Sequence, residues 1–428
     1  DTSQKVIVLE QNKIGHSTTM KSTAKLTYLQ QDIALKIKNN VGFRAARDYV
    51  YAQINAIEEM VRIIQKENIS CHLEKNDSYL FVNEEKNQKK LRKVYQLYRD
   101  FDLTPEYQEI PQFSTTLSFR VKDTYVFHPL EYIYGLLKCL EEKGNISIYE
   151  HTRMIRFRKM ENGYRVFLEG GEQIDCHYFV FANHYLPFVS PYFLPLKNYL
   201  EVSSITAKPH ENLAYNAINL DKDVLSIRFF ENYQILLRNS KRLFNHSITE
   251  QEKEEAPFWW RNYDLMTQHG LPLIGRIQKN SNIFIASGYN TWGMTNSNIA
   301  ARIIASLIEK EENPFPYPFS SHYTPSLFSV FHFLEDNIHQ FIHFIGSYLL
   351  PQGKAKIIWK KGKRYGVYVD LDNKKHVVAL TCPHMKCSLR FNEQEKTWDC
   401  PCHGSKFDVD GNLIRGPATN CIKQDTTF

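Results

Sequence analysis

The alternation of apolar and polar residues predicts short β-strands near both ends of the chain. Residues 355–381 alternate around Gly366 and an Asp-Leu-Asp-Asn turn, which is typical of a small antiparallel sheet. Near the start of the chain, residues 5–11 form a short apolar run that predicts a strand ending at Glu10. The two ends of the chain are therefore expected to contribute to different β-structures.

Two longer patterns predict helices. Apolar residues 283–286 predict a strand, which leads through two glycines into a helix beginning near Thr295 or Asn296. Residues 326–350 are rich in apolar side chains, but two adjacent carboxylates interrupt them, so this segment cannot cross a bilayer unaided. We predict that it forms an amphipathic helix that connects two domains.

Length and composition indicate a soluble globular protein. A chain of 428 residues with 43% hydrophobic residues can bury more than one core, which favours two to three domains. No charged segment followed by an apolar one opens the chain, so the sequence predicts a cytoplasmic protein without membrane association. In that compartment, clustered cysteines favour metal binding over structural disulfides.

The net charge of +6 comes from the last part of the chain. Residues 354–428 hold 14 Lys and Arg against 8 Asp and Glu, and the remainder is balanced. This excess is too small for a nucleic-acid partner, and no basic patch interleaved with aromatic residues supports one. It fits either a solvated basic face or a docking surface for an acidic redox protein.

Four of the eight cysteines lie within 21 residues, in two clusters that also contain histidine. Candidate metal ligands are Cys382, His384, Cys400 and His403. A structural zinc site could use two Cys and two His, but its usual order is Cys, Cys, His, His. Here each cluster supplies one Cys-x-His or Cys-x-x-His unit. That arrangement favours a Rieske [2Fe–2S] centre, in which one iron has two thiolates and the other two imidazoles.

The segments "CPHMKC" and "CPCHGSKFDVDGNLIRGPA" resemble the paired boxes of Rieske domains that contain a disulfide. The resemblance implies that Cys382 and Cys400 bind one iron and that His384 and His403 bind the other. It further implies a disulfide between the cysteines that remain, Cys387 and Cys402. Lys386 departs from the family pattern, which usually has glycine at this position.

The rest of the chain is expected to hold the electron source or sink of the cluster. An acidic residue at a strand end, such as Glu10, binds ribose hydroxyls in dinucleotide-binding folds, about 20 residues after a glycine-rich turn. That turn would lie roughly ten residues before Asp1 and is not in this sequence. The following segment, "EQNKIGHSTTMKSTAKLT", resembles FAD-dependent oxidoreductases of the glycine/D-amino-acid oxidase type. The segments 127–154, 178–187, 263–277 and 283–308 resemble later motifs of that family, in the same order.

The resemblance implies an α/β fold with a Rossmann-like FAD-binding domain, an inserted α+β substrate domain with an antiparallel sheet, and a small all-β Rieske domain. We expect the oxidoreductase domain to occupy residues 1–325 and the Rieske domain 351–428. Within the first domain, the expected FAD-binding parts are 1–75, 120–186 and 263–315, and the expected substrate parts are 76–119 and 187–262. The expected FAD-binding residues are Glu10, Gly15, Thr18, Thr19, Ala182, Gly288, Gly293, Met294 and Thr295.

These features predict a flavin-dependent dehydrogenase that oxidises an amine or amino-acid-like donor and passes single electrons to the cluster. A protein is expected to accept the electrons. Two alternatives stay open: electron flow from cluster to flavin, and a non-catalytic Rieske carrier on a scaffold without flavin. Candidate substrate-binding residues are Arg228 and Arg276 for a polar group, and His128, Tyr289 and Trp292 for an aromatic pocket.

Overall fold

The computed structural model describes residues 4–184, 198–240, 254, 256–278, 281–315, 317–321, 355–360, 362–384, 386–393, 395–401 and 404–422. The chain divides into two compact units. Unit 1 comprises Asp1–Ala182 and Glu201–Thr324, and unit 2 comprises Asn183–Leu200 and Pro325–Phe428. The connecting helix predicted at 326–350 lies outside the described residues, and the finer limits of the FAD-binding and substrate parts stay predictions.

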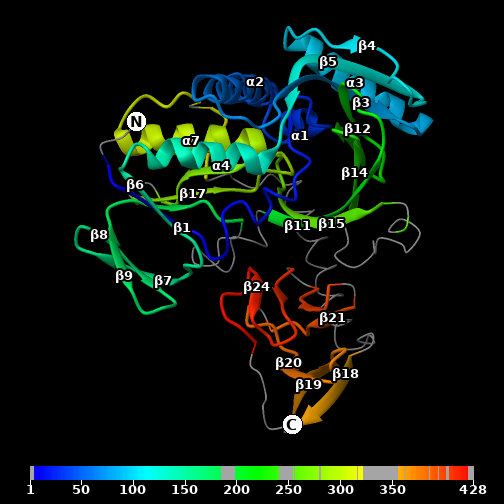
Figure 1. The fold of residues 1–428 in the computed structure, drawn as a ribbon. Helices are drawn as coiled ribbons and strands as arrows, with labels where there is room; N and C mark the ends of the chain where they lie inside the picture. Colours follow the sequence, from blue (N-terminus) through cyan, green and yellow to red (C-terminus); the bar gives the residue numbers. More distant parts are fainter. Residues whose placement is uncertain are drawn as a thin grey trace. The chain divides into compact units, whose positions relative to one another are not determined.

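Unit 1 contains two small sheets of parallel and mixed strands that carry the predicted flavin motifs (Figure 1). In one, β1 pairs in parallel with β6; in the other, β17 pairs in parallel with β10 and antiparallel with β16. Helix α7 packs on β16, β17 and α2, whereas α4 packs on β6. The elements are β1 (Val6–Leu9), β6 (Ile146–Tyr149), β10 (Phe179–Phe181), β16 (Leu273–Arg276), β17 (Ile283–Ser287), α2 (Phe43–Lys66), α4 (Pro129–Glu141) and α7 (Gly293–Glu309).

The sequence predicted the strand and helix of the last motif, but the helix begins earlier than expected. Strand β17 is entirely buried, as its apolar run indicates. Helix α7 begins at Gly293, because the N–H of Asn296 already donates to the carbonyl of Trp292, which is the N-cap. Three backbone N–H groups, those of residues 293–295, precede that first helical hydrogen bond and have no acceptor within the helix.

The second part of unit 1 is a large sheet of nine strands, in the order β15-β11-β14-β13-β12-β3-β5-β2, with β4 paired to β5. The prediction of an antiparallel sheet was wrong at one place, since β12 and β3 are parallel. Residues far apart in sequence form that pair, and residue pattern alone does not reveal its direction. The strands are β2 (Lys25–Leu26), β3 (Glu74–Val82), β4 (Glu106–Tyr107), β5 (Leu117–Val126), β11 (Asn198–Pro209), β12 (Tyr215–Asn219), β13 (Leu225–Phe230), β14 (Tyr233–Ser240) and β15 (Phe258–Thr267).

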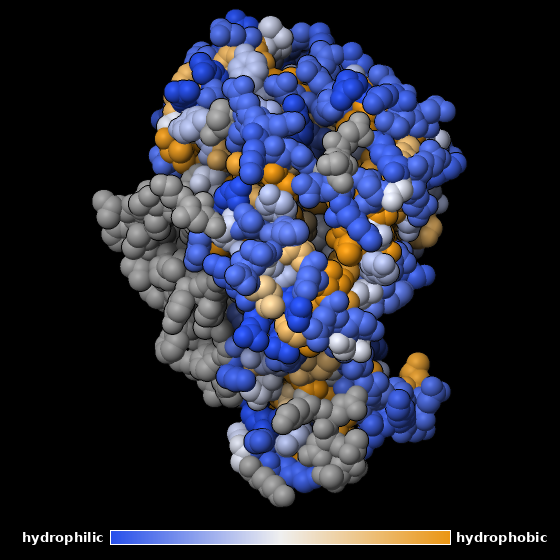
Figure 2. Space-filling model, turned by 90° about the vertical axis from the view of Figure 1, so that its left-hand side faces the viewer, coloured by the Kyte–Doolittle hydropathy of each residue, from blue (hydrophilic) through white to orange (hydrophobic). Residues whose placement is uncertain are grey.

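Helices and sheets of unit 1 share one principal hydrophobic core. Helix α2 contributes to it a buried stripe that includes Ala45, Tyr49, Ala52 and Ala56, at the three- to four-residue spacing of an amphipathic helix. The remaining elements are α1 (Ile33–Asn40), α3 (Gln88–Asp100), the 3₁₀ turn η1 (Glu85–Asn87) and a separate sheet of β7 (Met154–Met160), β8 (Gly163–Leu168) and β9 (Gln173–Cys176). The face drawn in Figure 2 is mainly hydrophilic, with hydrophobic residues in small groups.

Unit 2 contains two small antiparallel sheets around a core of its own. The predicted sheet around Gly366 is confirmed as β18-β19-β20, and four further strands form the order β21-β22-β23-β24. Trp398, which is fully buried, packs against Gly366 from the other sheet. The strands are β18 (Lys356–Lys360), β19 (Lys363–Val369), β20 (Lys375–Ala379), β21 (Arg390–Asn392), β22 (Thr397–Asp399), β23 (Lys406–Phe407) and β24 (Leu413–Arg415).

A buried histidine joins two turns of unit 2. The Nε2 of His376 lies 3.1 Å from Asp370 Oδ2, and its Nδ1 lies 2.8 Å from Asp410 Oδ1. Burial alone would lower the pKa of His376, but hydrogen bonds to both carboxylates raise it above the usual 6.5. Mainly because of His376, the pKa of Asp370 is lowered. The charged form of each group is therefore stabilised by folding.

We expect the stability of unit 2 to fall at alkaline pH. A histidine whose pKa is raised by folding contributes fully below its unfolded pKa near 6.5 and loses that contribution as the pH rises through the higher folded value. The urea midpoint for unfolding of the wild type should therefore fall, relative to the midpoint of the His376→Asn variant, as the pH is raised from 6 to 9. A constant difference between the two proteins would contradict the ion-pair assignment.

Candidate metal centre and flavin site

Two loops of unit 2 with the same backbone pattern carry the predicted metal ligands. In the first, the N–H of Cys382 donates to the carbonyl of Cys387 (2.9 Å), and the N–H of Lys386 donates to that of Cys382 (3.1 Å). In the second, the N–H of Cys400 donates to the carbonyl of Ser405 (2.7 Å), and the N–H of Gly404 donates to that of Cys400 (3.0 Å). Each loop thus places its first cysteine at the start of an equivalent turn.

The described donor atoms fit a cluster with sulfur and nitrogen ligands. Cys382 and Cys400 form no disulfide and are 0% and 1% exposed, in the core of unit 2. His384 is half-buried, and burial lowers its pKa, which favours the neutral imidazole that a metal requires. His403 and Cys402 lie outside the described residues, and no group of three potential ligands is assembled among the residues that are described. The ligand set with His403 stays a prediction.

The disulfide prediction has partial support. Cys387 is disulfide-bonded, and six other cysteines, including Cys382 and Cys400, form no disulfide. The partner of Cys387 lies outside the described residues, so its pairing with Cys402 is a proposal. A bond between these loops would hold both ligand-bearing turns together.

Further contacts fix the second loop. The guanidinium of Arg415 donates to the carbonyl of Gly404 through Nη2 (2.8 Å) and Nε (3.2 Å). The buried Ser405 Oγ accepts the N–H of Ala418 at 2.9 Å, which leaves its hydroxyl hydrogen available to a cluster sulfur. These contacts hold the loop in a defined position beside Cys400.

The backbone of Lys386 adopts the left-handed conformation, which is the reason that the family pattern usually has glycine at this position. Its φ is +61°, and the equivalent residue of the second loop, Gly404, has φ +77°. A residue with a Cβ atom costs roughly 1–2 kcal/mol in this conformation. The sequence departs from the pattern here, yet the loop keeps the torsion.

Substitution of Lys386 by glycine is therefore expected to stabilise the protein. Relief of the left-handed strain exceeds the extra unfolded-state entropy of glycine, so the free energy of unfolding should rise by about 0.5–1 kcal/mol. Urea unfolding of Lys386→Gly measures this, and Lys386→Ala, which keeps a Cβ atom, is the matched control. Equal stability of the two variants would contradict the strain argument.

The residues predicted to bind the adenosine part of a flavin lie after β1 in unit 1. Glu10 follows the strand, and its Oε1 accepts the N–H of Asn12 at 2.8 Å, which leaves Oε2 for a ribose hydroxyl. Gly15 has φ +77° and begins a turn in which its carbonyl accepts the N–H of Met20. Thr18 and Thr19 lie half-buried in this turn. Their arrangement fits the resemblance.

A buried asparagine holds the loop between β17 and α7. Asn290 is 1% exposed with φ +53°. Its Oδ1 accepts the N–H of Thr267 at 2.7 Å, and its Nδ2 donates to the carbonyls of Gly270 (2.9 Å) and Gly288 (3.1 Å). Gly288 also has a positive φ, +69°. The sequence analysis missed Asn290, although its place between two predicted flavin-binding glycines was a usable signal.

A fully buried polar network supports the start of α7. Gln30 Nε2 donates to Gln53 Oε1 (3.0 Å) and Thr295 Oγ1 (3.2 Å), and Gln53 Nε2 donates to Asn296 Oδ1 (2.9 Å). Tyr49 closes the ring, because its hydroxyl donates to Gln30 Oε1 at 2.7 Å and accepts from Asn296 Nδ2 at 3.3 Å. The hydroxyl of Thr295 thus accepts a hydrogen bond from Gln30 inside the protein.

The other predicted residues of this motif differ in their surroundings. Trp292 is buried, and its indole Nε1 has no hydrogen-bond partner among the described residues. Such a buried, unpaired donor next to open helix N–H groups fits a site that an additional polar group completes. Tyr289 is half-buried, and burial raises its pKa. Met294 packs into the core beside α2 and α4, whereas Ala182 is exposed directly after β10.

The two arginines predicted to bind substrate have different roles. Arg276 donates to the carbonyls of Ser281 (2.7 Å) and Leu307 (3.1 Å), so it joins the β16-β17 turn to the far end of α7 from Gly293. These contacts give Arg276 a structural role away from the helix start. Arg228 is 3% exposed and lies on the large sheet beside Lys25, which is also buried and which the sequence analysis missed.

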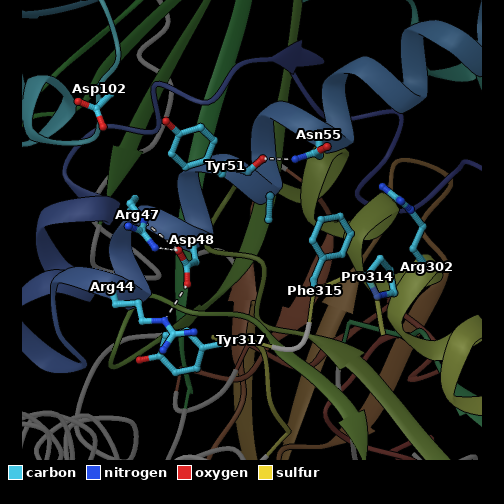
Figure 3. A pocket seen from close by; sticks show the side chains of 11 residues that line it. Arg44, Arg47, Asp48, Tyr51, Asn55, Asp102, Arg302, Pro314, Phe315 and Tyr317 are labelled. Atoms are coloured by element: carbon cyan, nitrogen blue, oxygen red, sulfur yellow. Dashed lines mark hydrogen bonds and ion pairs between the residues drawn. The ribbon is translucent and has the colours of Figure 1, made fainter. Parts of the chain in front are cut away.

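An open hollow of about 530 Å³ lies on the surface of unit 1 (Figure 3). It is lined by residues of α2 and α7 and by the segment that follows α7. Arg44 and Arg47 both pair with Asp48 there, at 3.4 and 3.0 Å, and Arg302 lies across the hollow beside Phe315. None of the predicted flavin or substrate residues lines it, so we do not assign it to the active site.

Comparison with known proteins identifies both parts of the chain. Residues 2–229, more than half of the chain, match the family described as FAD dependent oxidoreductase. The chain belongs to this family. Residues 345–425 match the Rieske [2Fe-2S] domain. This FAD-dependent oxidoreductase therefore carries a C-terminal Rieske domain and uses FAD and a [2Fe–2S] cluster as cofactors.

Individual relatives agree with this assignment. The oxidoreductase is 28% identical to YhfW of Bacillus subtilis (strain 168), named as a Rieske 2Fe-2S iron-sulfur protein, over 98% of this chain and 88% of that protein. It is 33% identical over 75 residues to the cytochrome b6-f complex iron-sulfur subunit 3 of a Nostoc strain, which covers 17% of this chain and 42% of the subunit.

Solved structures share the fold of the larger part. Glycine oxidase from Geobacillus kaustophilus matches with a TM-score of 0.60 and 14% identity, over 75% of this chain and 92% of that one. L-Proline dehydrogenase from P. horikoshii matches with a TM-score of 0.58 and 13% identity, over 73% and 95%. These likenesses confirm the predicted Rossmann-like α/β fold. Among the residues that the structure describes, no helix is long and apolar enough to span a membrane.

Proposed function

We propose that the protein is a dehydrogenase that oxidises an amine or amino-acid-like donor at FAD and passes the electrons singly to its Rieske cluster. The observation that carries this proposal is the presence, in one chain, of a domain of the FAD dependent oxidoreductase family and the two matched loops that hold Cys382 and Cys400. When bound, FAD accepts a hydride and the [2Fe–2S] cluster accepts one electron at a time. A protein electron acceptor and a cytoplasmic location are part of this proposal.

The residues of unit 1 would orient the two reactants. Open N–H groups at the start of α7 and the indole N–H of Trp292 would bind polar atoms of the cofactor, while Glu10 would bind its ribose. In the donor, the carbon beside nitrogen loses a hydride and the nitrogen loses a proton, which yields an imine. Such a reaction depends mainly on holding the donor carbon close to the accepting atom.

A donor screen tests the proposal. The purified protein should contain flavin and about two irons per chain. Anaerobic addition of amines and amino acids should bleach the flavin absorbance with at least one of them. Iron without flavin, or flavin that no such donor reduces, would contradict the proposed function.

A further inference from the structure

The hairpin of β18 and β19 in unit 2 carries a concentrated positive charge. Residues 354–369, which include both strands, contain six Lys and Arg and no Asp or Glu. The remaining residues of this part of the chain, 370–428, contain eight basic and eight acidic residues. The whole positive excess of the last part of the chain therefore belongs to this hairpin.

The lysines of the hairpin lie at its surface. Lys356 and Lys363 are exposed, and Lys360 is half-buried. Lys360 and Lys363 are directly opposite one another in the last register pair before the turn, and like charges in such a pair destabilise a sheet. Among the described residues of unit 2, the ion pairs are those of His376 and Lys406, so they involve neither exposed lysine. A negatively charged partner would offset this repulsion.

Protection of a sheet edge accounts for only part of this pattern. Strand β18 is an edge strand, and lysines on an edge prevent pairing with other sheets. Lys363, however, lies on β19, the central strand of the sheet. Edge protection also does not require the tryptophan that β18 exposes.

That tryptophan, Trp359, is 68% exposed. Ile357, two residues earlier on the same face of β18, packs against the core of unit 2, so Trp359 extends beyond the core at the hairpin end. The guanidinium of Arg364, its register partner on β19, lies 5.9 Å from its ring centre. Tryptophan and arginine are enriched among the residues that dominate binding at protein interfaces. The combination favours a protein partner.

The hairpin end lies next to the first loop with predicted metal ligands. The N–H of Leu380, which follows β20, donates to the carbonyl of Arg364 at 3.0 Å. Cys382 follows Leu380 by two residues, and its loop closes back on Leu380 through the N–H of Leu389 at 3.2 Å. A protein docked at Trp359 would therefore lie close to the loop of Cys382, as electron transfer requires.

We propose that the hairpin end formed by Trp359, Lys360 and Lys363 is the docking surface for an acidic protein that accepts electrons from the cluster. This inference rests on the proposed function, which includes a protein acceptor, and adds the charge of that protein and its binding site. Carboxylates of the partner would face the lysines, and Trp359 would be buried on contact. One electron leaves the reduced cluster and reduces the partner, and no bond or proton is exchanged.

Binding of two redox proteins of opposite charge tests the surface without turnover. The probes are plastocyanin, which is acidic, and cytochrome c, which is basic, and titration calorimetry with all proteins oxidised measures their affinities. We expect plastocyanin to bind more tightly than cytochrome c at low salt, and its affinity to fall as salt is added. Trp359→Ala should weaken binding about tenfold at every salt concentration. Lys363→Glu should weaken it about tenfold at low salt and approach the wild type at high salt.

The matched control is Lys374→Glu. Lys374 is also exposed, but it lies in the turn between β19 and β20, at the opposite end of the sheet from the turn between β18 and β19. Its substitution changes the net charge by the same amount as Lys363→Glu and should leave the affinity for plastocyanin within about twofold of the wild type. An unchanged absorption spectrum of the cluster shows that each variant is folded.

Several results would overturn the docking surface. They are equal losses of affinity in Lys363→Glu and Lys374→Glu, unchanged affinity in Trp359→Ala, and binding of cytochrome c as tight as that of plastocyanin. Binding to vesicles with one third phosphatidylserine that Trp359→Ala abolishes, without binding of plastocyanin, would assign the hairpin to an anionic membrane instead.

The same variants separate this inference from the proposed function. Dithionite reduces the cluster without any amine donor, and the reduced protein should then reduce plastocyanin more slowly in Trp359→Ala than in the wild type. If the hairpin passes these tests but no amine or amino acid reduces the flavin, the docking surface stands and the proposed function fails. If a donor reduces the flavin but the hairpin variants bind plastocyanin like the wild type, only the docking surface fails.

Discussion

Replacement of Cys382 by serine is expected to abolish the [2Fe–2S] cluster and leave the flavin in place. Cys382 is a fully buried thiol at the start of the first of the two matched loops. A serine hydroxyl stays protonated near neutral pH and does not replace a thiolate as an iron ligand. Iron content should fall from about two per chain to near zero, and the visible absorbance of the cluster should disappear with it. The flavin content per chain should not change.

The matched control for this experiment is Cys421→Ser. Cys421 is also a free cysteine of unit 2, but it is exposed and belongs to neither loop. Its substitution should leave iron content and absorbance as in the wild type. Retention of iron in Cys382→Ser, or equal loss in both variants, would contradict the assignment of the loops.

Substitution of Asn290 by alanine is expected to be the most destabilising single change near the flavin segments. The change removes the side-chain acceptor of the buried Thr267 N–H and the side-chain donor to the carbonyls of Gly270 and Gly288. It also places alanine, which has a Cβ atom but no polar side chain, at φ +53°. Each buried polar group left unpaired costs about 1–3 kcal/mol. We expect a loss of about 3–5 kcal/mol in the free energy of unfolding, measured by urea denaturation, and weaker retention of FAD.

Asn290→Gly separates the two causes. Glycine also lacks the side chain, but it adopts the left-handed conformation without strain, so it should recover about 1 kcal/mol relative to alanine. Both variants should lose FAD more readily on gel filtration, because both release the loop that carries Gly288. Alanine and glycine variants as stable as the wild type would show that this loop does not depend on Asn290.

The two loops that carry the predicted metal ligands could be located from the sequence because their residue pattern is local. Each loop encloses its predicted ligands within a few residues, so the spacing of Cys and His indicates the turn directly. Lys386 shows the limit of that method: its identity departs from the family pattern, and only the backbone shows that it adopts the same left-handed conformation as Gly404. His403, a predicted metal ligand, lies outside the described residues, so its role stays a prediction.

The flavin and substrate regions could be predicted only in part because their contacts join distant segments. The strand, the turn and α7 were evident from the apolar pattern, and the observed start at Gly293 is close to the predicted one. By contrast, Gln30 meets Thr295, 265 residues later, and no local pattern marks such a pair. Lys25 likewise has the sequence surroundings of an ordinary surface lysine, and only the packing of β2 into the large sheet buries it beside Arg228.

Electron paramagnetic resonance of the cluster reports the direction of electron transfer. An amino acid that bleaches the flavin should be added anaerobically to the purified protein, and the spectrum recorded at low temperature. We predict the signal of a reduced Rieske cluster after donor addition, and its absence in Cys382→Ser, whose flavin still bleaches. A fully bleached flavin beside a cluster that stays oxidised would contradict electron flow from donor to cluster.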